Sequence, residues 1–263
     1  MGPALVASIA YVDPGNVAAN VTAGSRYGYL LLWVLLTASL MAVLVQYQSA
    51  RLGLVTGRTL PELVGDRLRR PARLAFWVQA EVVAAATDLA EVIGGAIALN
   101  LLFDLPLVLG GVIIGAVSMA LLAVQNHYGQ RSFESVVIAL LAVIAIGFVS
   151  GVLVDPPDPR EVAAGFIPRF AGTDSVLLAT SMLGATVMPH AIYVHSALAR
   201  DRHGRPHAGH QRSHLLRVTR WDVLVALGIA GVVNIAMLVL AATSLRGIPG
   251  TDTIEGAHAA VVS

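Results

Sequence analysis

Two short motifs combine polar side chains with proline inside stretches that are apolar enough to span a membrane. The first is the Asp-Pro-Gly-Asn run from Asp13 to Asn16, and the second is the Met-Pro-His run from Met188 to His190. Proline lacks a backbone N–H and glycine tolerates unusual dihedral angles, so each motif is expected to interrupt a helix. Irregular backbone at membrane depth persists only where it is buried in protein or lines a cavity. An ionisable side chain at such a break is costly, which favours a functional site.

The first motif offers hard oxygen ligands to a cation. Asp13 supplies a carboxylate and Asn16 an amide oxygen, and they lie three positions apart. The carbonyl of Ala10 is a further candidate ligand, because the break disturbs its role as a helical acceptor. The alternative is that Asp13 only caps a helix, since Asp before Pro is a common helix start.

The second motif changes which ion is plausible. Met188 offers a soft thioether, which binds Mg²⁺ and Ca²⁺ poorly and later divalent ions better. A mixed set of carboxylate, amide, carbonyl and thioether therefore favours Mn²⁺ or Fe²⁺. The carbonyl of Ala185, one turn earlier, becomes a ligand if the helix opens there. Taken alone, Met188 would be a core residue, but its place before Pro189 favours the site.

Titratable side chains near these motifs predict a proton pathway. His190 could bind metal, but a proton-transfer or structural role is preferred, because a His beside a carboxylate suits proton transfer. Glu81, Asp88 and Glu91 fall on one face of a helix expected over residues 72–102. Carboxylates in an apolar helix are typical of proton relays. For Glu81, simple solvation at the membrane edge is an equal alternative.

Composition identifies the broad class of the chain. Hydrophobic residues make up 56% of the 263 and charged residues only 13%, which excludes an ordinary soluble domain and indicates a polytopic membrane protein. The chain has no Cys, so disulfides and thiolate metal sites are excluded. No enzyme activity, no resident cofactor and no nucleic-acid partner are expected; the partners are metal ions, protons and the lipid bilayer.

The apolar pattern predicts seven transmembrane helices, the first and sixth of them broken. A span needs about 20 apolar residues, and the expected helices cover residues 2–24, 28–52, 72–102, 106–126, 132–154, 174–199 and 218–245. Arginine is concentrated in the connections 51–73 and 200–220, which predicts that both are cytoplasmic, with the N-terminus inside. The His-rich connection 202–214 is interpreted as a solvated linker, with metal sensing as the alternative.

These motifs resemble those of the Nramp family of divalent-metal transporters. The segments 13–16 and 188–190 are similar to the family's broken helices, and the run from Ala84 to Glu91 is similar to its acidic third helix. The resemblance implies an all-α, LeuT-type inverted-repeat transporter of the cell membrane. It also implies metal binding by Asp13, Asn16, Met188 and the carbonyls of Ala10 and Ala185. Proton movement is then linked to Asp13, Asp88 and Glu91, with the imidazole of His190 nearby.

The resemblance also predicts how the chain is organised. Residues 1–263 are expected to form one membrane domain, with a five-helix repeat over about 1–154 and the start of a second over about 174–245. Family members have more helices, so we expect this chain to be a truncated form. The predicted function is proton-coupled import of Mn²⁺ or Fe²⁺ by alternating access. The alternatives are an amino-acid or other small-solute transporter of the same fold and, less favoured, an intramembrane hydrolase.

Overall fold

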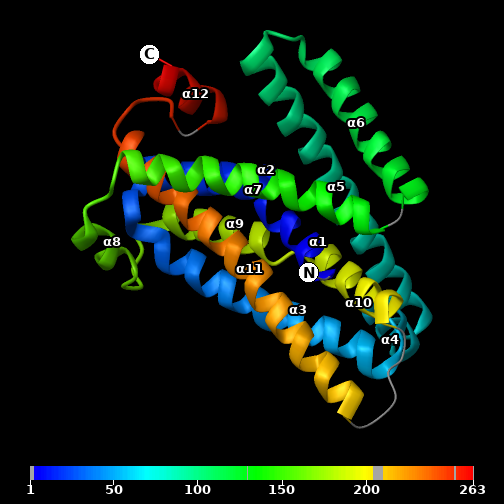
Figure 1. Cartoon of the computed structure of the whole chain (residues 1–263). Coiled ribbons are helices and arrows are strands. Elements are labelled where there is room, and N and C mark those ends of the chain that lie inside the picture. Colours follow the sequence, from blue (N-terminus) through cyan, green and yellow to red (C-terminus); the bar gives the residue numbers. More distant parts are fainter. Residues whose placement is uncertain (1–2, 129, 204–209, 252, 263) are drawn as a thin grey trace.

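The chain folds into a bundle of helices. The computed structural model describes residues 3–128, 130–203, 210–251 and 253–262, and the described part contains no β-strand (Figure 1). In chain order the elements are α1 (Pro3–Ile9), the 3₁₀ turn η1 (Ala10–Val12), α2 (Pro14–Tyr27), the 3₁₀ turn η2 (Gly28–Leu31), α3 (Leu32–Thr56), α4 (Leu60–Arg67), α5 (Arg70–Phe103), α6 (Leu107–Tyr128), α7 (Gln130–Val154), α8 (Pro159–Gly165), α9 (Thr173–Thr186), α10 (Pro189–His203), α11 (His210–Ser244) and α12 (Ile254–Val262).

The helices lie where the apolar pattern predicts them. Within the described residues, five segments are long and apolar enough to cross a membrane, and a sixth apolar helix, Leu107–Ala123, is shorter. One of the five, Ala7–Thr56, is 50 residues long and contains both the first and the second expected helix. The short helices α4, α8 and α12 were not predicted, and α11 begins at His210 rather than at 218. Its first turns are polar, so hydropathy alone does not reveal them. Residues 204–209 of the His-rich connection lie outside the described residues, so its interpretation stays a prediction.

Both expected helix breaks are present. Asp13 separates η1 from α2 with extended backbone angles, φ −77° and ψ 168°. Val187 ends α9 with φ −101° and ψ 79°, and α10 begins at Pro189. The first break lies immediately before Pro14, and the second lies two residues before Pro189. This is expected because proline has no N–H to donate to the preceding turn of the helix.

The central packing joins each broken helix to the helix that follows the other one. α11 packs along α2, and α10 packs along α3. The second contact is tight, because a Cβ on Gly53 of α3 would collide with the carbonyl oxygen of Ser196 in α10. The hydroxyl of Ser49, one turn before Gly53, donates to the carbonyl of Ile192 at 2.5 Å. α10 is therefore fixed more firmly to α3 than to α9, the helix that precedes it.

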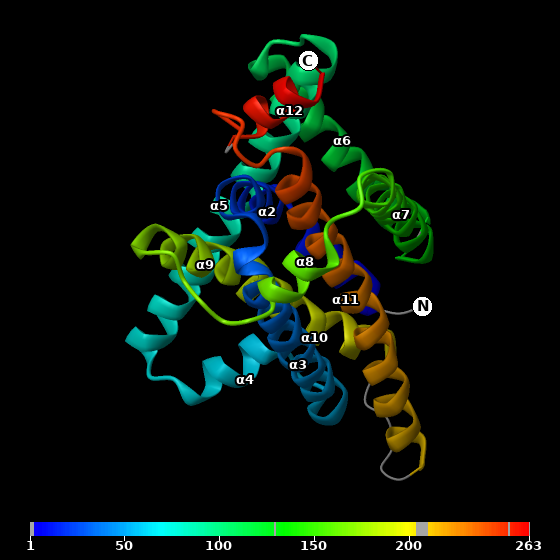
Figure 2. The same cartoon turned by 90° about the vertical axis from the view of Figure 1, so that its left-hand side faces the viewer.

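The hairpin of α5 and α6 extends from one side of the bundle (Figures 1 and 2). Most of α5 is exposed, and only Ala96 of its residues is buried. Its contact with the first break is close: a Cβ on Gly94 would lie 2.7 Å from the Pro14 ring. Gly94 thus lets α5 approach the break.

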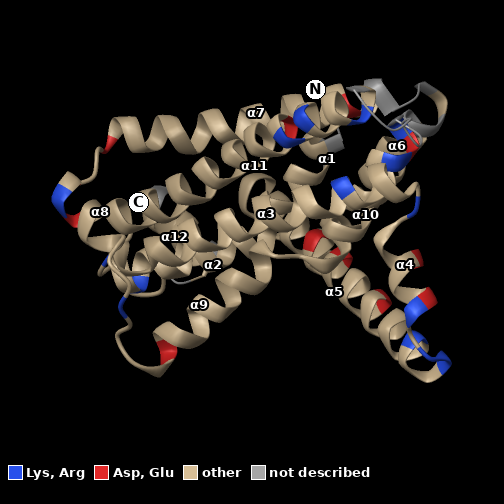
Figure 3. Cartoon of the chain, turned by 90° about the horizontal axis from the view of Figure 1, so that it is seen from below, with Lys and Arg blue, Asp and Glu red and all other residues tan. Residues whose placement is uncertain are grey.

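Charged residues gather towards the ends of the helices, and the middle of the bundle carries few of them (Figure 3). One group ties α4 to α10. Thr59 forms a capping box with Glu62, and Arg200 of α10 pairs with Glu62 at 3.0 Å. The backbone N–H of Thr59, together with Arg200, holds the pKa of Glu62 below its usual range.

Candidate metal centre

The first break places Asp13 as the N-cap of α2. Its Oδ1 accepts from the backbone N–H of Asn16 at 2.8 Å and from the Asn16 side-chain amide at 2.6 Å. The capping alternative is thus correct as a description of the backbone. A capped helix start inside an apolar span is itself a broken helix, so the cap and the site do not exclude each other.

Asn16 joins the two breaks. Its side-chain Nδ2 also donates to the carbonyl of Ala185 at 2.9 Å, and its Oδ1 accepts from the hydroxyl of Thr186 at 3.1 Å. The residue is only 1% exposed. Residues 169 positions apart in sequence therefore form one buried polar cluster.

The two prolines explain why backbone carbonyls are available at this point. In an α-helix the carbonyl of residue i accepts from the N–H of residue i+4. For Ala10 that donor position is Pro14, and for Ala185 it is Pro189. Neither proline has an N–H, so both carbonyls lack an α-helical donor at i+4, although Ala10 begins the 3₁₀ turn η1, in which bonds run from i+3. The carbonyl of Ala185 accepts from Asn16 instead.

The second motif contributes two side chains near the same break. Met188 lies between α9 and α10 and is buried, 5% exposed. His190 lies in the first turn of α10 within electrostatic range of Asp13. Its Nδ1 is buried and, among the described residues, has no hydrogen-bond partner. The metal-binding roles of Asp13, Asn16, Met188, Ala10 and Ala185 stay predictions.

The acidic residues of α5 divide into two groups. Glu91 lies one turn before Gly94 and is within electrostatic range of both Asp88 and Asp13. Glu81 lies ten residues earlier, about 15 Å along the helix axis, where it lines a cavity of about 470 Å³ with Tyr193 of α10. All three carboxylates are exposed in this structure. Their role as a proton pathway stays a prediction.

A second buried polar network connects the same helices. Gln46 of α3 donates from Nε2 to the hydroxyl of Tyr11 at 2.8 Å, and its Oε1 lies 2.8 Å from Nδ1 of His195 in α10. Asn234 of α11 donates to the carbonyl of Tyr11 at 2.7 Å. From the sequence, Gln46 and Asn234 could support the site, with helix packing as the preferred role, and Tyr11 was not predicted. A signal was present, since each is a lone polar residue in an apolar helix.

The His, Asp and Glu side chains of the described residues do not form a metal-binding cluster by themselves. Among the described residues, no group of three or more His, Asp or Glu side chains could hold an ion. A metal at the breaks would therefore need the amide, carbonyl and thioether groups as well.

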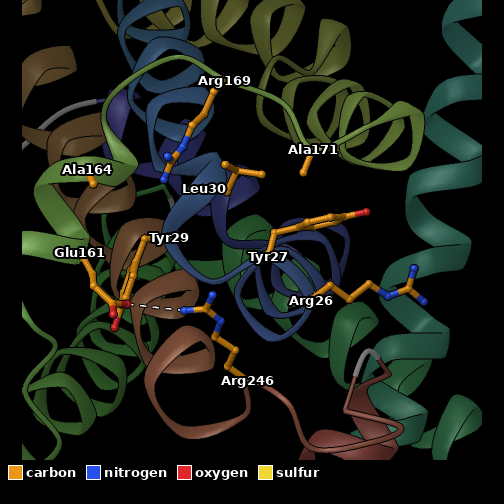
Figure 4. A pocket seen from close by; sticks show the side chains of 9 residues that line it. All are labelled: Arg26, Tyr27, Tyr29, Leu30, Glu161, Ala164, Arg169, Ala171 and Arg246. Carbon is orange, nitrogen blue, oxygen red and sulfur yellow. Dashed lines mark ion pairs between the residues drawn. The ribbon is translucent and has the colours of Figure 1, made fainter.

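A separate cavity of about 410 Å³ lies where α2, η2, α8 and the end of α11 meet. It is lined by Arg26, Tyr27, Tyr29, Leu30, Glu161, Ala164, Arg169, Ala171 and Arg246 (Figure 4). Arg246 pairs with Glu161 at 3.5 Å, while Arg26 extends past Tyr27 in another direction. None of these residues belongs to the two breaks.

The fold and the paired breaks define a class: α-helical membrane proteins of the LeuT-like fold. The sequence profile described as "Natural resistance-associated macrophage protein-like", Nramp, matches residues 4–262. The chain therefore belongs to the Nramp family.

Known proteins agree with this assignment. The chain is 64% identical over 261 residues to the "Divalent metal cation transporter MntH" of Mycobacterium tuberculosis, covering 99% of this chain and 61% of that protein. It is 47% identical over 244 residues to the protein of the same description from Bacillus subtilis, covering 92% and 57%. The chain thus spans about three fifths of the length of these relatives.

Solved structures show the same fold. A crystal structure of the Eremococcus coleocola manganese transporter, in complex with an aromatic bis-isothiourea substituted compound, has a TM-score of 0.82 and 34% identity. The match covers 92% of this chain and 51% of that one. The expected all-α fold is confirmed.

Proposed function

We propose that this chain functions in the proton-coupled import of divalent transition-metal ions, Mn²⁺ or Fe²⁺, by alternating access. The observation that carries the proposal is the hydrogen bonding of Asn16, which joins the carboxylate of Asp13 to the carbonyl of Ala185 across two helix breaks. The relatives named as divalent metal cation transporters, and the structural neighbour named as a manganese transporter, support the same substrate class.

The proposed ligands are the side chains of Asp13, Asn16 and Met188 and the carbonyls of Ala10 and Ala185. In this structure the amide of Asn16 directs Nδ2 at Asp13 and Ala185. An amide nitrogen cannot coordinate a cation, so ion binding requires the amide to rotate and present Oδ1. Rotation also frees the carboxylate and the carbonyl for the ion. In the rotated state Nδ2 would face the hydroxyl of Thr186, which can accept because it also donates to the carbonyl of Met182.

The proposed selectivity follows from the thioether of Met188. Mg²⁺ and Ca²⁺ prefer oxygen ligands and hold their water, whereas Mn²⁺ and Fe²⁺ tolerate a softer ligand. A single carboxylate also leaves the site with one negative charge. The remaining ligands of the site are neutral, and the thioether among them favours Mn²⁺ and Fe²⁺ over Mg²⁺ and Ca²⁺.

The proposed proton route leads from Asp13 to the acidic group of α5. Asp13 loses its proton when the ion binds, and Glu91 and Asp88 are the carboxylates within electrostatic range along α5. The imidazole of His190 lies within electrostatic range of Asp13, and Glu81 lies further from Asp13 along α5. We place the chain in the cell membrane with the N-terminus and the ends of α4 and α10 on the cytoplasmic side.

The alternatives fit the break less well. A carrier of amino acids would bind the substrate carboxylate at the N-terminus of a half-helix. Here that position, the start of α2, is already occupied by the carboxylate of Asp13. A hydrolase would need a nucleophile or a water-activating metal cluster. We therefore assign a transport role and no enzymatic one.

The test is Mn²⁺ binding to the purified chain in detergent, measured by titration calorimetry with excess Mg²⁺ present. We expect saturable binding that is lost in Asp13→Ala. Asp174→Ala is the matched control, because it removes an exposed carboxylate from the first turn of α9 and leaves the breaks intact. Equal heats for the wild-type chain and Asp13→Ala would contradict the proposal.

A further inference from the structure

Four arginines lie within seven residues where α4 leads into α5. They are Arg67, Arg69, Arg70 and Arg73, and all four are exposed. Figure 3 shows the basic residues gathered at this bend, away from the centre of the bundle. Among the residues that the structure describes, no carboxylate lies within ion-pair distance of any of the four.

Two of the nearby acids already have other partners, and a third, Glu81, lines a neighbouring cavity with Arg73 and Trp77. Asp66 pairs with Arg58 at 2.5 Å, and Glu62 pairs with Arg200 at 3.0 Å. The first turn of α5 contains no acidic residue. The bend therefore carries an excess of positive charge that the described part of the chain does not neutralise.

A cavity gives this charge a defined shape. It has a volume of about 400 Å³ and is lined by Arg70, Arg73, Leu74 and Trp77. Steps of three, four and seven residues place all four side chains on one face of α5. Leu74 is 59% exposed and Trp77 is 56% exposed, although both are large and apolar. The face is therefore charged in its first turn and apolar in its second.

A charged turn followed by an apolar turn suits a ligand with a charged headgroup and an apolar chain. A guanidinium group offers five N–H donors in a geometry suited to phosphate oxygens. Trp is typical of the membrane–water interface, and the apolar part of α5 continues from it. A water-soluble anion would use the arginines and leave Leu74 and Trp77 exposed. A phospholipid would cover both parts of the face.

We propose that Arg70 and Arg73 bind the phosphate headgroup of an anionic phospholipid, whose acyl chain lies along Leu74 and Trp77. The site is separate from the two helix breaks and does not depend on metal binding. If the four arginines served only to orient the chain in the membrane, their positive charge would be sufficient and their positions would not matter. A lipid site requires in addition that Arg70 and Arg73, which line the cavity, contribute more to lipid binding than Arg67 and Arg69.

The experiment uses Trp77 as a reporter of the neighbouring lipid. The chain has three Trp residues, so Trp33→Phe with Trp221→Phe leaves Trp77 alone. The protein is reconstituted in phosphatidylcholine vesicles containing a small, equal fraction of either brominated phosphatidylglycerol or brominated phosphatidylcholine. Bromine quenches Trp fluorescence on contact, so the ratio of quenching measures the preference for the anionic lipid. We expect stronger quenching by the brominated phosphatidylglycerol.

Matched variants decide between a site and general attraction. Arg70→Gln with Arg73→Gln should lower the preference by about fivefold for each arginine removed. Arg67→Gln with Arg69→Gln removes the same charge from the same bend but not from the cavity, and should retain most of the preference. Equal quenching by the two lipids in the parent protein, or an equal loss in both pairs of variants, would overturn the proposal.

A further experiment distinguishes the phosphate of a lipid headgroup from free inorganic phosphate. Inorganic phosphate is added to the vesicles and compared with chloride at the same ionic strength. We expect the same preference in both salts, because a bound lipid is held by its acyl chain as well as by its headgroup. Loss of the preference in phosphate alone would mean that the cavity takes the free anion, and the lipid assignment would be wrong.

Discussion

At the scale of single residues, the candidate site results from two missing N–H groups. Pro14 and Pro189 deprive the carbonyls of Ala10 and Ala185 of their helical donors. Asn16 then hydrogen-bonds to one of these carbonyls and to the carboxylate of Asp13. Among the described residues, no three His, Asp or Glu side chains lie close enough together to hold an ion, so the proposed site would combine one carboxylate with amide, carbonyl and thioether groups.

Replacing the thioether should change which ions the site accepts. Met188→Ala removes the soft ligand and leaves the oxygen ligands, so we expect weaker binding of Mn²⁺ and Cd²⁺ and better tolerance of Ca²⁺ and Mg²⁺. Competition titrations of the purified variant with each ion measure this directly. Met182→Ala, at another buried Met one turn before Thr186, is the control for loss of packing. An unchanged order of ion preference in Met188→Ala would refute the role of the thioether.

Sequence reasoning could find the residues at the breaks because proline acts locally. Asp13 and Ala185 were both predicted as part of the site, and the structure brings them to the same amide of Asn16. The hydroxyl of Thr186 was not predicted. Such hydroxyls usually bond within their own helix, as Thr186 also does to Met182. Only the three-dimensional approach of α2 to α9 shows its second partner.

At the scale of helices, the two halves of the second broken helix have different supports. α9 packs on α2 and α3, whereas α10 packs on α3 and also contacts α1, α4 and α5. A hydrogen bond from the backbone N–H of Leu60 to the hydroxyl of Ser196, at 3.0 Å, adds to the attachment of α10 to α4. The break at Val187 is thus a boundary between two differently supported segments.

A side chain at Gly53 should weaken this attachment. Gly53→Ala places a methyl group against the carbonyl of Ser196, and we expect destabilisation of about 1–3 kcal/mol from the overpacked contact. Gly228→Ala is the matched control in α11, because a Cβ there meets no atom within 4 Å. The control should be stabilised by about 0.5–1 kcal/mol, since Ala suits a helix interior better than Gly.

Thermal unfolding midpoints in detergent compare the two variants. The Gly53→Ala midpoint should fall and the Gly228→Ala midpoint should stay level or rise. A fall of equal size in both would mean that the close contact between α3 and α10 is unimportant for stability.

The positions of the long helices could largely be predicted from the sequence, whereas the contacts between helices could not. Spans of about 20 apolar residues give the helices directly, but α4 and α8 are too short and too polar for that signal. The one-face arrangement of Glu81, Asp88 and Glu91 was derived from helix period alone. The place of Glu81 near the start of the span already set it apart from the other two, but helix period gives no information on which neighbouring helices each carboxylate meets.

At the scale of the whole molecule, the pairing of α2 with α11 and of α3 with α10 repeats one arrangement twice. Each broken helix contacts the long helix that follows the other broken helix. Two inverted repeats would produce this exchange, and a first repeat over about 1–154 with the start of a second over about 174–245 stays our proposal.

The absence of Cys makes the proposed orientation directly testable. The chain has no Cys, so Arg67→Cys and Arg160→Cys each introduce a single thiol at an exposed position on opposite connections. In intact cells, a membrane-impermeant maleimide should label Arg160→Cys and not Arg67→Cys. Both should be labelled after permeabilisation. The reverse pattern in intact cells would invert the orientation.

The bond between Asn16 and Ala185 bears on the return step of the carrier cycle proposed above. A carrier without cargo must move its vacant site back across the membrane, and unsatisfied dipoles in that site would slow the movement. Here three of the groups that we propose as ligands hydrogen-bond to one another, and these bonds join the two breaks. In the carrier cycle proposed above, these bonds would keep the two breaks connected during any step in which no ion bridges them.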